Sequence, residues 1–320
     1  MATKGERGSM EQRRKTGILF WMLKIGVSAL LLFFVVRKAG PANVIKHVQA
    51  MNPWFFLLAV VIYIGIAWLI ALRWRILLDY RYPAGRLFSL HMIGNFFNTI
   101  LPSSMGGDAV KAYYLYREMK SGGVSFGSVF LDRYLGLFAR LILGMASGLA
   151  AYSKLKPIGL HWAMPAIFGV FIAGSAVVFR LRIGKRFGAI ADFYDYLHSH
   201  LMRGQVLLKT FLLSLVIQIF LIAMIAAVAW SIGQRLSFTE LFVFIPIIMT
   251  IMIVPVSFSG FGVREGAFVL LFGLTGIPAS ISISISFLWF LSTAAASLIG
   301  LFEYLRYRKK TAGPGPSPVP

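Results

Sequence analysis

Two short polar stretches interrupt strongly apolar sequence, and they decide how this chain folds. The first reads Leu101-Pro102-Ser103-Ser104-Met105-Gly106-Gly107-Asp108-Ala109-Val110-Lys111, and the second reads Val254-Pro255-Val256-Ser257-Phe258-Ser259-Gly260-Phe261-Gly262-Val263-Arg264-Glu265. Each contains a proline, serines, glycines and charged residues. Broken and charged backbone at membrane depth is tolerated where it is buried in protein or lines a water-filled cavity. A pair of such breaks in corresponding halves of a chain indicates the binding site of a transporter.

The composition indicates a polytopic membrane protein. Of the 320 residues, 58% are hydrophobic and only 13% are charged, which is not typical of a water-soluble globule. The net charge of +21 would suggest nucleic acid as the partner of a soluble chain. Basic residues also gather in the loops on one side of a membrane, so we expect no nucleic-acid partner here. The chain has no cysteine, which excludes disulfides, thiol catalysis and cysteine-ligated metals.

Six segments are long and apolar enough to cross the core of a bilayer, which takes roughly 20 residues. They are residues 17–36, 54–72, 129–152, 162–179, 206–231 and 281–302. Two further apolar regions, 87–119 and 236–276, each consist of two short limbs around one of the polar stretches. We interpret these two regions as broken, re-entrant hairpins. The alternative is eight ordinary spans with two polar turns, which is the number that hydropathy alone gives.

The lysines and arginines are distributed unevenly around these segments. With six spans and two hairpins, the loops and termini on one side hold 22 of them, those on the other side hold 6, and four lie in or near spans. The basic side faces the cytoplasm, so both termini are predicted to be cytoplasmic, in the inner membrane. The order helix, helix, hairpin, helix then occurs twice in opposite orientations, over residues 17–152 and 162–302. This order predicts an inverted-topology repeat whose hairpins meet near the midplane.

The predicted fold is therefore all-α, with a single transmembrane domain over residues 17–310. The polar and basic residues 1–16 and the tail 311–320, with its Gly-Pro-Gly-Pro-Ser-Pro run, are predicted to be disordered. No polar stretch is long enough to fold alone, so we expect no soluble domain.

Three carboxylates fall at the polar stretches or inside a span, namely Asp108, Asp132 and Glu265. A carboxylate buried without a partner is costly, so each predicts a nearby cation or a polar cavity. The candidate cations are Lys111, Arg140 and Arg264. One hypothesis is that Asp108–Lys111 and Arg264–Glu265 are structural ion pairs that hold the hairpin tips. The other is that these groups form a site for a charged headgroup.

The segment from Val129 carries a stripe of residues four positions apart: Asp132, Gly136, Arg140, Gly144 and Gly148. Steps of four follow one slowly winding face of a helix. Glycines on that face permit close helix contacts, so Arg140 is predicted to point into the bundle. Asp132 and Arg133 lie near the start of this helix. They are candidates for the polar site, and the alternative interpretation is that their side chains only extend to the membrane surface.

Helices that begin after Gly106-Gly107 and after Ser259-Gly260 would expose free N–H groups and a partial positive charge, which suit a phosphate oxygen. Neighbouring polar side chains would add hydrogen bonds; these are Asn95, Asn98, Ser103, Ser257 and Ser259. The alternative is that these side chains only satisfy the carbonyls freed by Pro102 and Pro255.

The substrate-binding residues are thus expected at both breaks and on the stripe between them. The full set is Asn95, Asn98, Pro102, Ser103, Gly106, Gly107, Asp108, Lys111, Asp132, Arg133, Arg140, Ser257, Ser259, Gly260, Gly262, Arg264 and Glu265. The sequence contains no phosphate-binding loop and no convincing catalytic motif. We therefore expect no enzyme activity, no cofactor and no metal site.

These residues resemble the integral-membrane family typified by the transmembrane region of lysylphosphatidylglycerol synthases, often called the flippase-like domain. The matching features are Gly94-Asn95 to Asn98, Leu101 to Asp108, Leu131-Asp132-Arg133 with Gly136-Leu137, and Pro255 with Ser257 followed by Gly260-Phe261-Gly262-Val263-Arg264-Glu265-Gly266. The resemblance covers roughly residues 17 to 310. It implies movement of lipids or lipid-linked intermediates between leaflets. In that family a separate soluble domain performs lysyl transfer, and none is found in this sequence, so we do not expect aminoacylation.

The function expected from the sequence is a lipid flippase for a charged phospholipid or a lipid-linked intermediate. The alternative is a membrane subunit of a glycolipid or lipid-modifying enzyme system that acts with a separate soluble partner. A third hypothesis is a structural protein that organises other membrane machinery. Membrane lipids are the expected partners, with a separately encoded lipid-modifying enzyme and further copies of this chain left open.

Overall fold

The computed structural model describes Phe33, Arg37 and residues 40–100, 106–181, 188–253 and 260–311. Helices and their connections account for these residues, and no strand occurs among them. The expected first span, 17–36, lies outside the described residues except for Phe33. The centres of both polar stretches, 101–105 and 254–259, also lie outside them.

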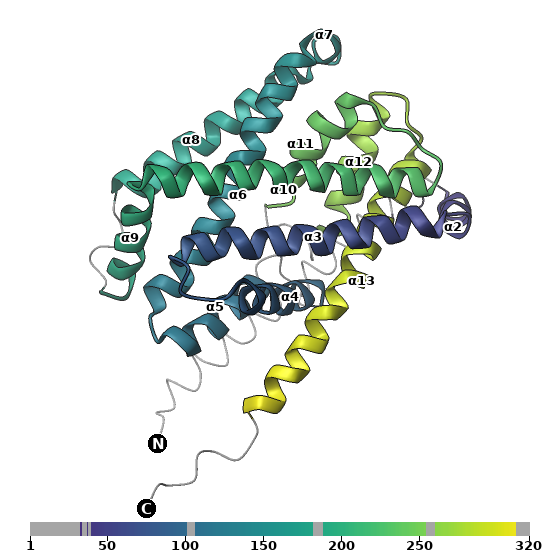
Figure 1. Ribbon diagram of the computed structural model, residues 1–320. Coiled ribbons are helices and arrows are strands. Elements are labelled where there is room, and N and C mark those ends of the chain that lie inside the picture. The colour runs from purple at the N-terminus through teal and green to yellow at the C-terminus, as the bar shows by residue number, and fades with distance from the viewer. Residues whose placement is uncertain are drawn as a thin grey trace, which may run out of the picture.

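The helices follow one another along the chain as Figure 1 shows. Their bounds are α2 (Pro41–Gln49), α3 (Pro53–Leu77), α4 (Ala84–Ile100), α5 (Gly106–Met119), α6 (Gly122–Ala150), α7 (Tyr152–Leu155), the 3-10 turn η1 (Leu160–Trp162), α8 (Ala163–Leu181), α9 (Gly188–Leu201), α10 (Gly204–Ser231), the π-helical turn η2 (Glu240–Phe244), α11 (Ile245–Ile251), α12 (Val263–Gly273) and α13 (Ala279–Thr311).

Four helical segments of the described chain are long and apolar enough to cross a membrane. They are Pro53–Leu77, Leu160–Val177, Gly204–Ser231 and Ala279–Arg308, and each coincides with an expected span. The expected span at 129–152 is also helical, as α6, but this helix carries three charged residues: Asp132, Arg133 and Arg140. The described residues are helical apart from their connections, as in a polytopic membrane protein. Helix α6 differs from the four apolar spans because it carries these charged residues.

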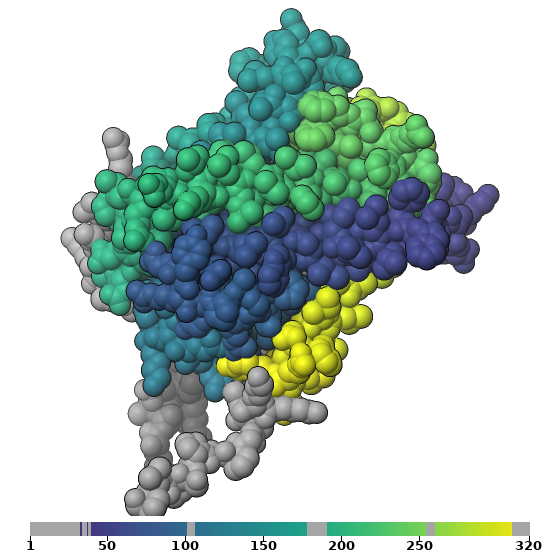
Figure 2. Space-filling view, in the orientation of Figure 1, coloured from purple at the N-terminus to yellow at the C-terminus, as the bar shows by residue number. Residues whose placement is uncertain are grey.

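Helices α3 and α10 lie side by side in opposite directions and form one face of the molecule (Figures 1 and 2). The side chain of Asn52 caps α3 by accepting a hydrogen bond from the Trp54 backbone N–H at 3.0 Å. The Asn52 backbone N–H donates to the carbonyl of Ser231 at 2.6 Å. The first residue of α3 therefore lies next to the last residue of α10.

Helices α4 and α5 form a hairpin with an unusually close contact. The Gly107 backbone N–H donates to Asn98 Oδ1 at 2.7 Å. A Cβ atom on Gly107 would lie only 1.8 Å from the Gly94 carbonyl oxygen. The two helices can meet this closely because neither contact position carries a side chain.

Both hairpins pack against α13, at different places along its length. In the first hairpin, Ser89 donates to Glu303 near the end of α13, and Thr99 donates to Ser297 nearer its middle. In the second hairpin, formed by η2–α11 and α12, Arg264 donates to Ser286. The α4–α5 hairpin thus runs along the C-terminal half of α13, and α12 runs along its N-terminal half.

The buried apolar side chains form two clusters that share α3 and α6. One cluster packs these helices against α10 to α13 around Phe244, Phe268 and Phe272. The other packs them against α4, α5 and α9 around Trp74 and Leu77. Several buried polar side chains also lie on the shared helices, and the candidate site is built from them.

Two details of the sequence interpretation need correction. Helix α3 continues to Leu77, so Arg73 lies inside the helix and is only 4% exposed. Lys111 on α5 is 1% exposed. Both residues were counted among the cytoplasmic loop charges, and without them the count is 20 against 6. The predicted asymmetry remains without these two residues.

Candidate functional site

Asp132 on α6 is the centre of a buried charge cluster. Its Oδ1 atom accepts a hydrogen bond from Arg73 Nε at 2.8 Å, and its Oδ2 atom lies 3.8 Å from Lys111 Nζ. Asp132 is 2% exposed. The alternative in which this carboxylate reaches the membrane surface is therefore wrong.

Neighbouring side chains fix both cations. Arg73 Nη1 donates to Ser214 Oγ on α10 at 2.8 Å. Lys111 Nζ lies 4.4 Å from the centre of the Trp74 ring, within the range of a cation–π interaction. The Trp74 indole N–H in turn donates to Ser128 Oγ at 3.0 Å. Three helices other than α6 thus contribute to the surroundings of one carboxylate.

Asp108, in the first turn of α5, pairs with Arg133 and not with Lys111. Arg133 Nε lies 2.8 Å from Asp108 Oδ2, and the Arg133 side chain is 56% exposed. The structural pair Asp108–Lys111 that the sequence suggested does not form, because Lys111 lies against Asp132 instead. Asp132 and Arg133 are adjacent in sequence, so they leave α6 in different directions and connect it to α5 at two points.

Arg140 has only neutral partners in the part of the chain that the structure describes. Its Nε atom donates to Gln218 Oε1 and its Nη1 atom to the Met249 carbonyl, both at the long distance of 3.4 Å. Gln218 Nε2 donates to the Gly136 carbonyl at 3.2 Å. Arg140 is half-buried and points into the bundle toward α10 and α11, which is the direction predicted for it.

We call these groups the central polar network: Arg73, Asp108, Lys111, Asp132, Arg133, Arg140, Ser214 and Gln218. It contains four cations and two carboxylates. The network therefore carries excess positive charge between the first hairpin and α11. Excess positive charge with donors at long distances suits an anionic group.

A second cluster lies on α12 and α13, and we call it the α12 pair. Glu265 Oε1 accepts hydrogen bonds from Arg264 Nη2 at 2.6 Å and Nε at 3.0 Å. Ser286 Oγ also donates to Oε1 at 3.0 Å, and Arg264 Nε donates to Ser286 at 2.8 Å. Both charged residues are less than 5% exposed. The α12 pair is neutral, which matches the structural ion pair considered from the sequence.

Aromatic rings surround the guanidinium of Arg264. Its Cζ atom lies 5.4 Å from the ring centres of Phe261 and Phe290 and 5.7 Å from that of Trp289. These distances permit cation–π contact with three rings. The positive charge of Arg264 therefore lies against Glu265 and among three aromatic rings.

The helix N-termini are already occupied by side chains. Helix α5 begins at Gly106, and Asn98 accepts from the Gly107 N–H. Gly262 is the N-cap of α12 and has a positive φ of 82°. Gly260, two residues earlier, also has a positive φ, of 80°. The Gly262 N–H donates to Glu265 Oε2 at 2.7 Å. Positive charge at this site is thus supplied by side chains more than by free backbone N–H groups.

The remaining predicted residues divide into two groups. Asn95 lies on α4, and its buried Nδ2 atom has no hydrogen-bond partner. The others are Pro102, Ser103, Ser257 and Ser259, which lie outside the described residues. The structure therefore brings residues of the first break and of the α6 stripe together, and it places Arg264 and Glu265 in a cluster of their own.

Comparison with known families supplies the identification. The family described as "Lysylphosphatidylglycerol synthase TM region" matches residues 21–300. The chain belongs to this family. The match includes the central polar network and the α12 pair, and it confirms the resemblance derived from the two polar stretches.

Archaeal membrane proteins are among the relatives of this family member. A UPF0104 membrane protein of Methanocaldococcus jannaschii is 24% identical over 82% of this chain and 87% of its own length. Two UPF0104 membrane proteins of Methanothermobacter thermautotrophicus are 24% and 23% identical, over 88% and 94% of this chain and 94% and 96% of their own lengths. No solved structure matches the chain.

The sequence interpretation missed several residues that form or surround the central polar network and the α12 pair. They are Arg73, Trp74, Ser128, Ser214, Gln218 and Ser286. One signal was present for two of them. Ser214 and Gln218 are polar residues four positions apart in an apolar span, so they share one helix face, and polar residues inside spans usually face the bundle interior.

Proposed function

We propose that this protein moves a charged phospholipid, or a lipid-linked intermediate, between the leaflets of the inner membrane. The observation that carries the proposal is the central polar network, which holds four cations against two carboxylates. An anionic headgroup would balance the excess charge, so the network favours a headgroup with phosphate or another anion. Arg140 is the best first contact, because its present partners are neutral and distant.

The arrangement of the hairpins supports the same proposal. We infer six spanning helices with two re-entrant hairpins, related as an inverted repeat with both termini in the cytoplasm. The contacts of Thr99 with Ser297 and of Arg264 with Ser286 place the first hairpin against the C-terminal half of α13 and the second against its N-terminal half. In transporters with inverted repeats, the site lies at the midplane where broken helices meet.

The lipid would cross with its headgroup among polar side chains and its hydrocarbon chains in the bilayer. Asp108 and Asp132 already form ion pairs with cations of the network. When an anionic headgroup enters, these cations would turn part of their contacts from the carboxylates to the headgroup. Arg133 is exposed and paired to Asp108 at the hairpin tip, so it is placed to meet the headgroup from outside the bundle. We propose that no nucleotide motor drives this movement.

The family name favours a second candidate. It contains the word "synthase", which suits a membrane subunit that presents lipid to a separate soluble enzyme. Such a subunit would bind the same headgroups at the same cations but would not exchange them between leaflets on its own. Leaflet exchange by the purified protein distinguishes the two candidates.

The test is reconstitution of the purified protein into liposomes with fluorescent phosphatidylglycerol, followed by quenching of the outer leaflet. We expect leaflet exchange by wild type, and about tenfold slower exchange by Arg140→Gln, because a hydrogen bond to a charged group contributes about 1.5–3 kcal/mol. Arg235→Gln is the matched control, since Arg235 is exposed in the loop before η2.

Three results would each decide a different point. Exchange no faster than in protein-free liposomes would reject the flippase and favour the subunit. Exchange by wild type with full rates for Arg140→Gln would reject the site and keep the function. Equal slowing by Arg235→Gln would show that surface charge, not the network, controls the rate.

A further inference from the structure

The arginines inside the bundle differ in the charge of the group that accepts their hydrogen bonds. Arg73 is buried and donates to the carboxylate of Asp132 at 2.8 Å. Arg140 is half-buried, and its Nε atom donates to the side-chain amide of Gln218 at 3.4 Å. Gln218 is only 4% exposed. Buried charges are usually paired with an opposite charge, so an amide at this position is an exception.

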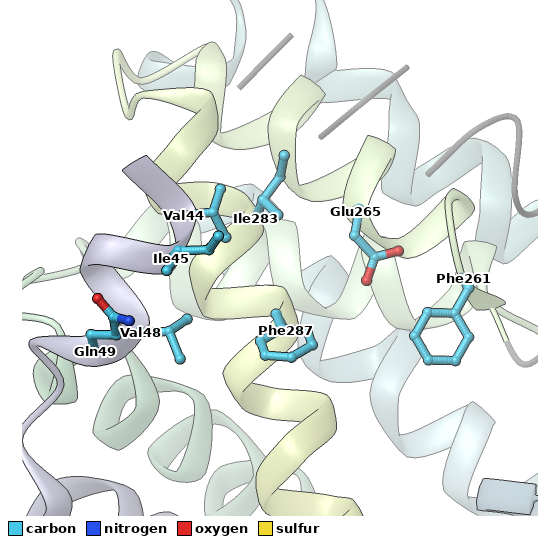
Figure 3. A pocket seen from close by; sticks show the side chains of 8 residues that line it. All are labelled: Val44, Ile45, Val48, Gln49, Phe261, Glu265, Ile283 and Phe287. Carbon is cyan, nitrogen blue, oxygen red and sulfur yellow. The ribbon is translucent and has the colours of Figure 1, made fainter. Parts of the chain in front are cut away.

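The α12 pair shows how the chain neutralises a buried arginine elsewhere. Glu265 and Phe261 are among the residues that line an apolar pocket (Figure 3). In these surroundings Glu265 Oε1 accepts two hydrogen bonds from Arg264, at 2.6 and 3.0 Å. The 3.4 Å bond between Arg140 and Gln218 is longer than the usual range of N–H···O bonds. The amide therefore orients Arg140 but holds it weakly.

The contacts of Gln218 fix which end of its amide faces Arg140. Its Nε2 atom donates to the Gly136 carbonyl at 3.2 Å, and a carbonyl can only accept. The Oε1 atom therefore faces Arg140 as an acceptor without charge. Ser214, one turn before Gln218 on α10, accepts a hydrogen bond from Arg73 at 2.8 Å. One face of α10 thus contacts both arginines, and it carries no acid at either position.

The other charges that act on Arg140 are positive. They belong to Arg133 and Arg73. The two carboxylates of the network are already paired. Asp132 accepts a hydrogen bond from Arg73, and Asp108 lies 2.8 Å from Arg133. Like charges in close proximity disfavour a further cation and favour an anion.

Arg140 also keeps hydrogen-bond donors for a ligand. A guanidinium has five N–H donors, and two of those of Arg140 have acceptors among the described residues, namely Gln218 and the Met249 carbonyl. The centres of the polar stretches, 101–105 and 254–259, contain no charged residue that could neutralise it. Donors in a fork and an uncompensated charge match two oxygens of a phosphate.

We propose that Gln218 is the residue that makes this site selective for headgroups with a net negative charge. Its neutral amide orients Arg140 and leaves the charge of Arg140 free to attract a phosphate. A zwitterionic headgroup would bring an ammonium group among arginines, where both carboxylates of the network already pair with cations. The inference rests on the proposed function for the identity of the ligand as a lipid, and it names phosphatidylglycerol-type lipids over phosphatidylethanolamine-type lipids.

The test measures which lipids stay on the protein. The purified protein is reconstituted into liposomes with equal amounts of phosphatidylglycerol and phosphatidylethanolamine that have the same chains, and is extracted again in mild detergent. Extraction at about pH 8 favours the ionised form of a carboxylate introduced by substitution. Mass spectrometry gives the ratio of the two lipids that remain bound. We expect wild type to retain phosphatidylglycerol about tenfold over phosphatidylethanolamine, as charge-assisted contacts to one headgroup would give.

Two substitutions of Gln218 separate charge from shape. Gln218→Glu places a carboxylate against Arg140, and we expect the lipid ratio to fall about tenfold, to near equality. Gln218→Met also loses the contact with Gly136 but adds no charge, so the ratio should stay near the wild-type value whatever the total amount retained. Gln205→Glu is the matched control, because it adds the same charge at an exposed position of α10. We expect no change of the ratio in this control.

Several results would overturn the proposal. They are equal retention of the two lipids by wild type, a wild-type ratio in Gln218→Glu, and a fall of the same size in Gln218→Met or Gln205→Glu. If Gln218→Glu does not fold, Arg140→Gln replaces it, because it removes the same uncompensated charge from the other side of the hydrogen bond. The ratio should then fall equally, and a wild-type ratio would reject the proposal.

The readout does not depend on leaflet exchange. A protein that retains phosphatidylglycerol as expected but exchanges no lipid would keep the selectivity and reject the flippase. A protein that exchanges both lipids at equal rates, and retains both equally, would keep the flippase and reject the role of Gln218.

Discussion

At the scale of single residues, Asp132 is the group on which two buried cations depend. Asp132→Asn leaves Arg73 and Lys111 without a carboxylate in a buried environment. Removal of one partner from a buried ion pair costs about 3–5 kcal/mol. We expect a clear fall in the thermal unfolding temperature of the detergent-purified protein, measured by intrinsic fluorescence.

Asp195→Asn is the control for this substitution, because Asp195 is exposed on α9. Surface substitutions away from special features change stability by less than about 0.5 kcal/mol. Equal unfolding temperatures for the two variants would show that Asp132 is not the counter-ion that the distances indicate.

The residues around Asp132 also show what one sequence can predict. The sequence predicted a buried role for Asp132, because acidic residues are rare in spans. It did not predict Arg73 as the partner of Asp132. Arg73 lies near Arg75 at the end of an apolar run, so both were interpreted as loop charges. The pair joins positions 59 apart in sequence. Periodicity within each span gives no information about which faces of two spans meet.

At the scale of helices, the hairpin of α4 and α5 depends on the absence of a side chain at Gly107. A methyl group there would lie 1.8 Å from the Gly94 carbonyl oxygen and 2.7 Å from Asn98 Cγ. Backbone cannot move away as a flexible side chain can, so Gly107→Ala must separate the helices. Overpacking of this kind costs about 1–3 kcal/mol, which we expect as a lower unfolding temperature.

Gly148→Ala is the opposite case and serves as the control. Gly148 also lies in a helix, but a methyl group there meets no atom within 4 Å. Replacement of an interior helical glycine by alanine is stabilising by about 0.5–1 kcal/mol. Destabilisation by both substitutions would show that helix flexibility, and not the α4–α5 contact, controls stability.

Helix α9 is attached to the end of α3 by one buried hydroxyl. Tyr196 donates to the Leu77 carbonyl at 2.5 Å, and burial raises the pKa of this phenol. Tyr196→Phe leaves the carbonyl unsatisfied, at a cost of about 1 kcal/mol. The raised pKa keeps the Tyr196 phenol protonated in the folded protein. The stability lost in Tyr196→Phe should therefore be equal at pH 6.5 and pH 9. Stability should fall only above about pH 10, where tyrosine in the unfolded chain ionises.

Thermal unfolding at several pH values checks this expectation. Tyr194→Phe on the same helix is the control, since its ring packs beside Phe193. A stability difference between Tyr196→Phe and wild type that changes between pH 6.5 and pH 9 would contradict a phenol held neutral by burial.

The bounds of the helices show a second limit of the sequence. The apolar runs predicted the starts of α3 and α13, and both ends of α10, within two residues. They predicted helices that are too short where a helix continues through polar residues. Helix α6 begins at Gly122 and not near Val129, because its polar first turns pack on α9, where Gly123 contacts Asp192, and hold Trp74 through Ser128. Hydropathy detects contact with lipid and not the helix itself.

At the scale of the whole molecule, the possible topologies place the hairpin ends at different depths. With re-entrant hairpins, Ile100 at the end of α4 lies inside the membrane, as its neighbour Thr99 lies against the middle of α13. If both limbs of each hairpin crossed the membrane instead, Ile100 would lie at the outer surface and Ile253, after α11, at the inner surface. With eight spans each of the two regions crosses once, so Lys156 in the loop after α7 would lie on the cytoplasmic side. The chain has no cysteine, so single cysteines report these positions without a background.

We expect Ile100→Cys to resist a membrane-impermeant maleimide added outside intact cells, while Lys156→Cys in the exposed loop after α7 reacts. In inverted vesicles we expect Ile253→Cys to resist the same reagent, while Lys120→Cys between α5 and α6 reacts. The reason is that both side chains are exposed on the protein surface, so at membrane depth they would face hydrocarbon, which a polar reagent does not enter. Rapid reaction of Ile100→Cys from outside together with Ile253→Cys from inside would establish that all four hairpin limbs cross the membrane, and a Lys156→Cys that reacts only in inverted vesicles would establish eight spans. In that case the two hairpins would no longer share a midplane, and the central polar network would have to bind a headgroup without the second hairpin.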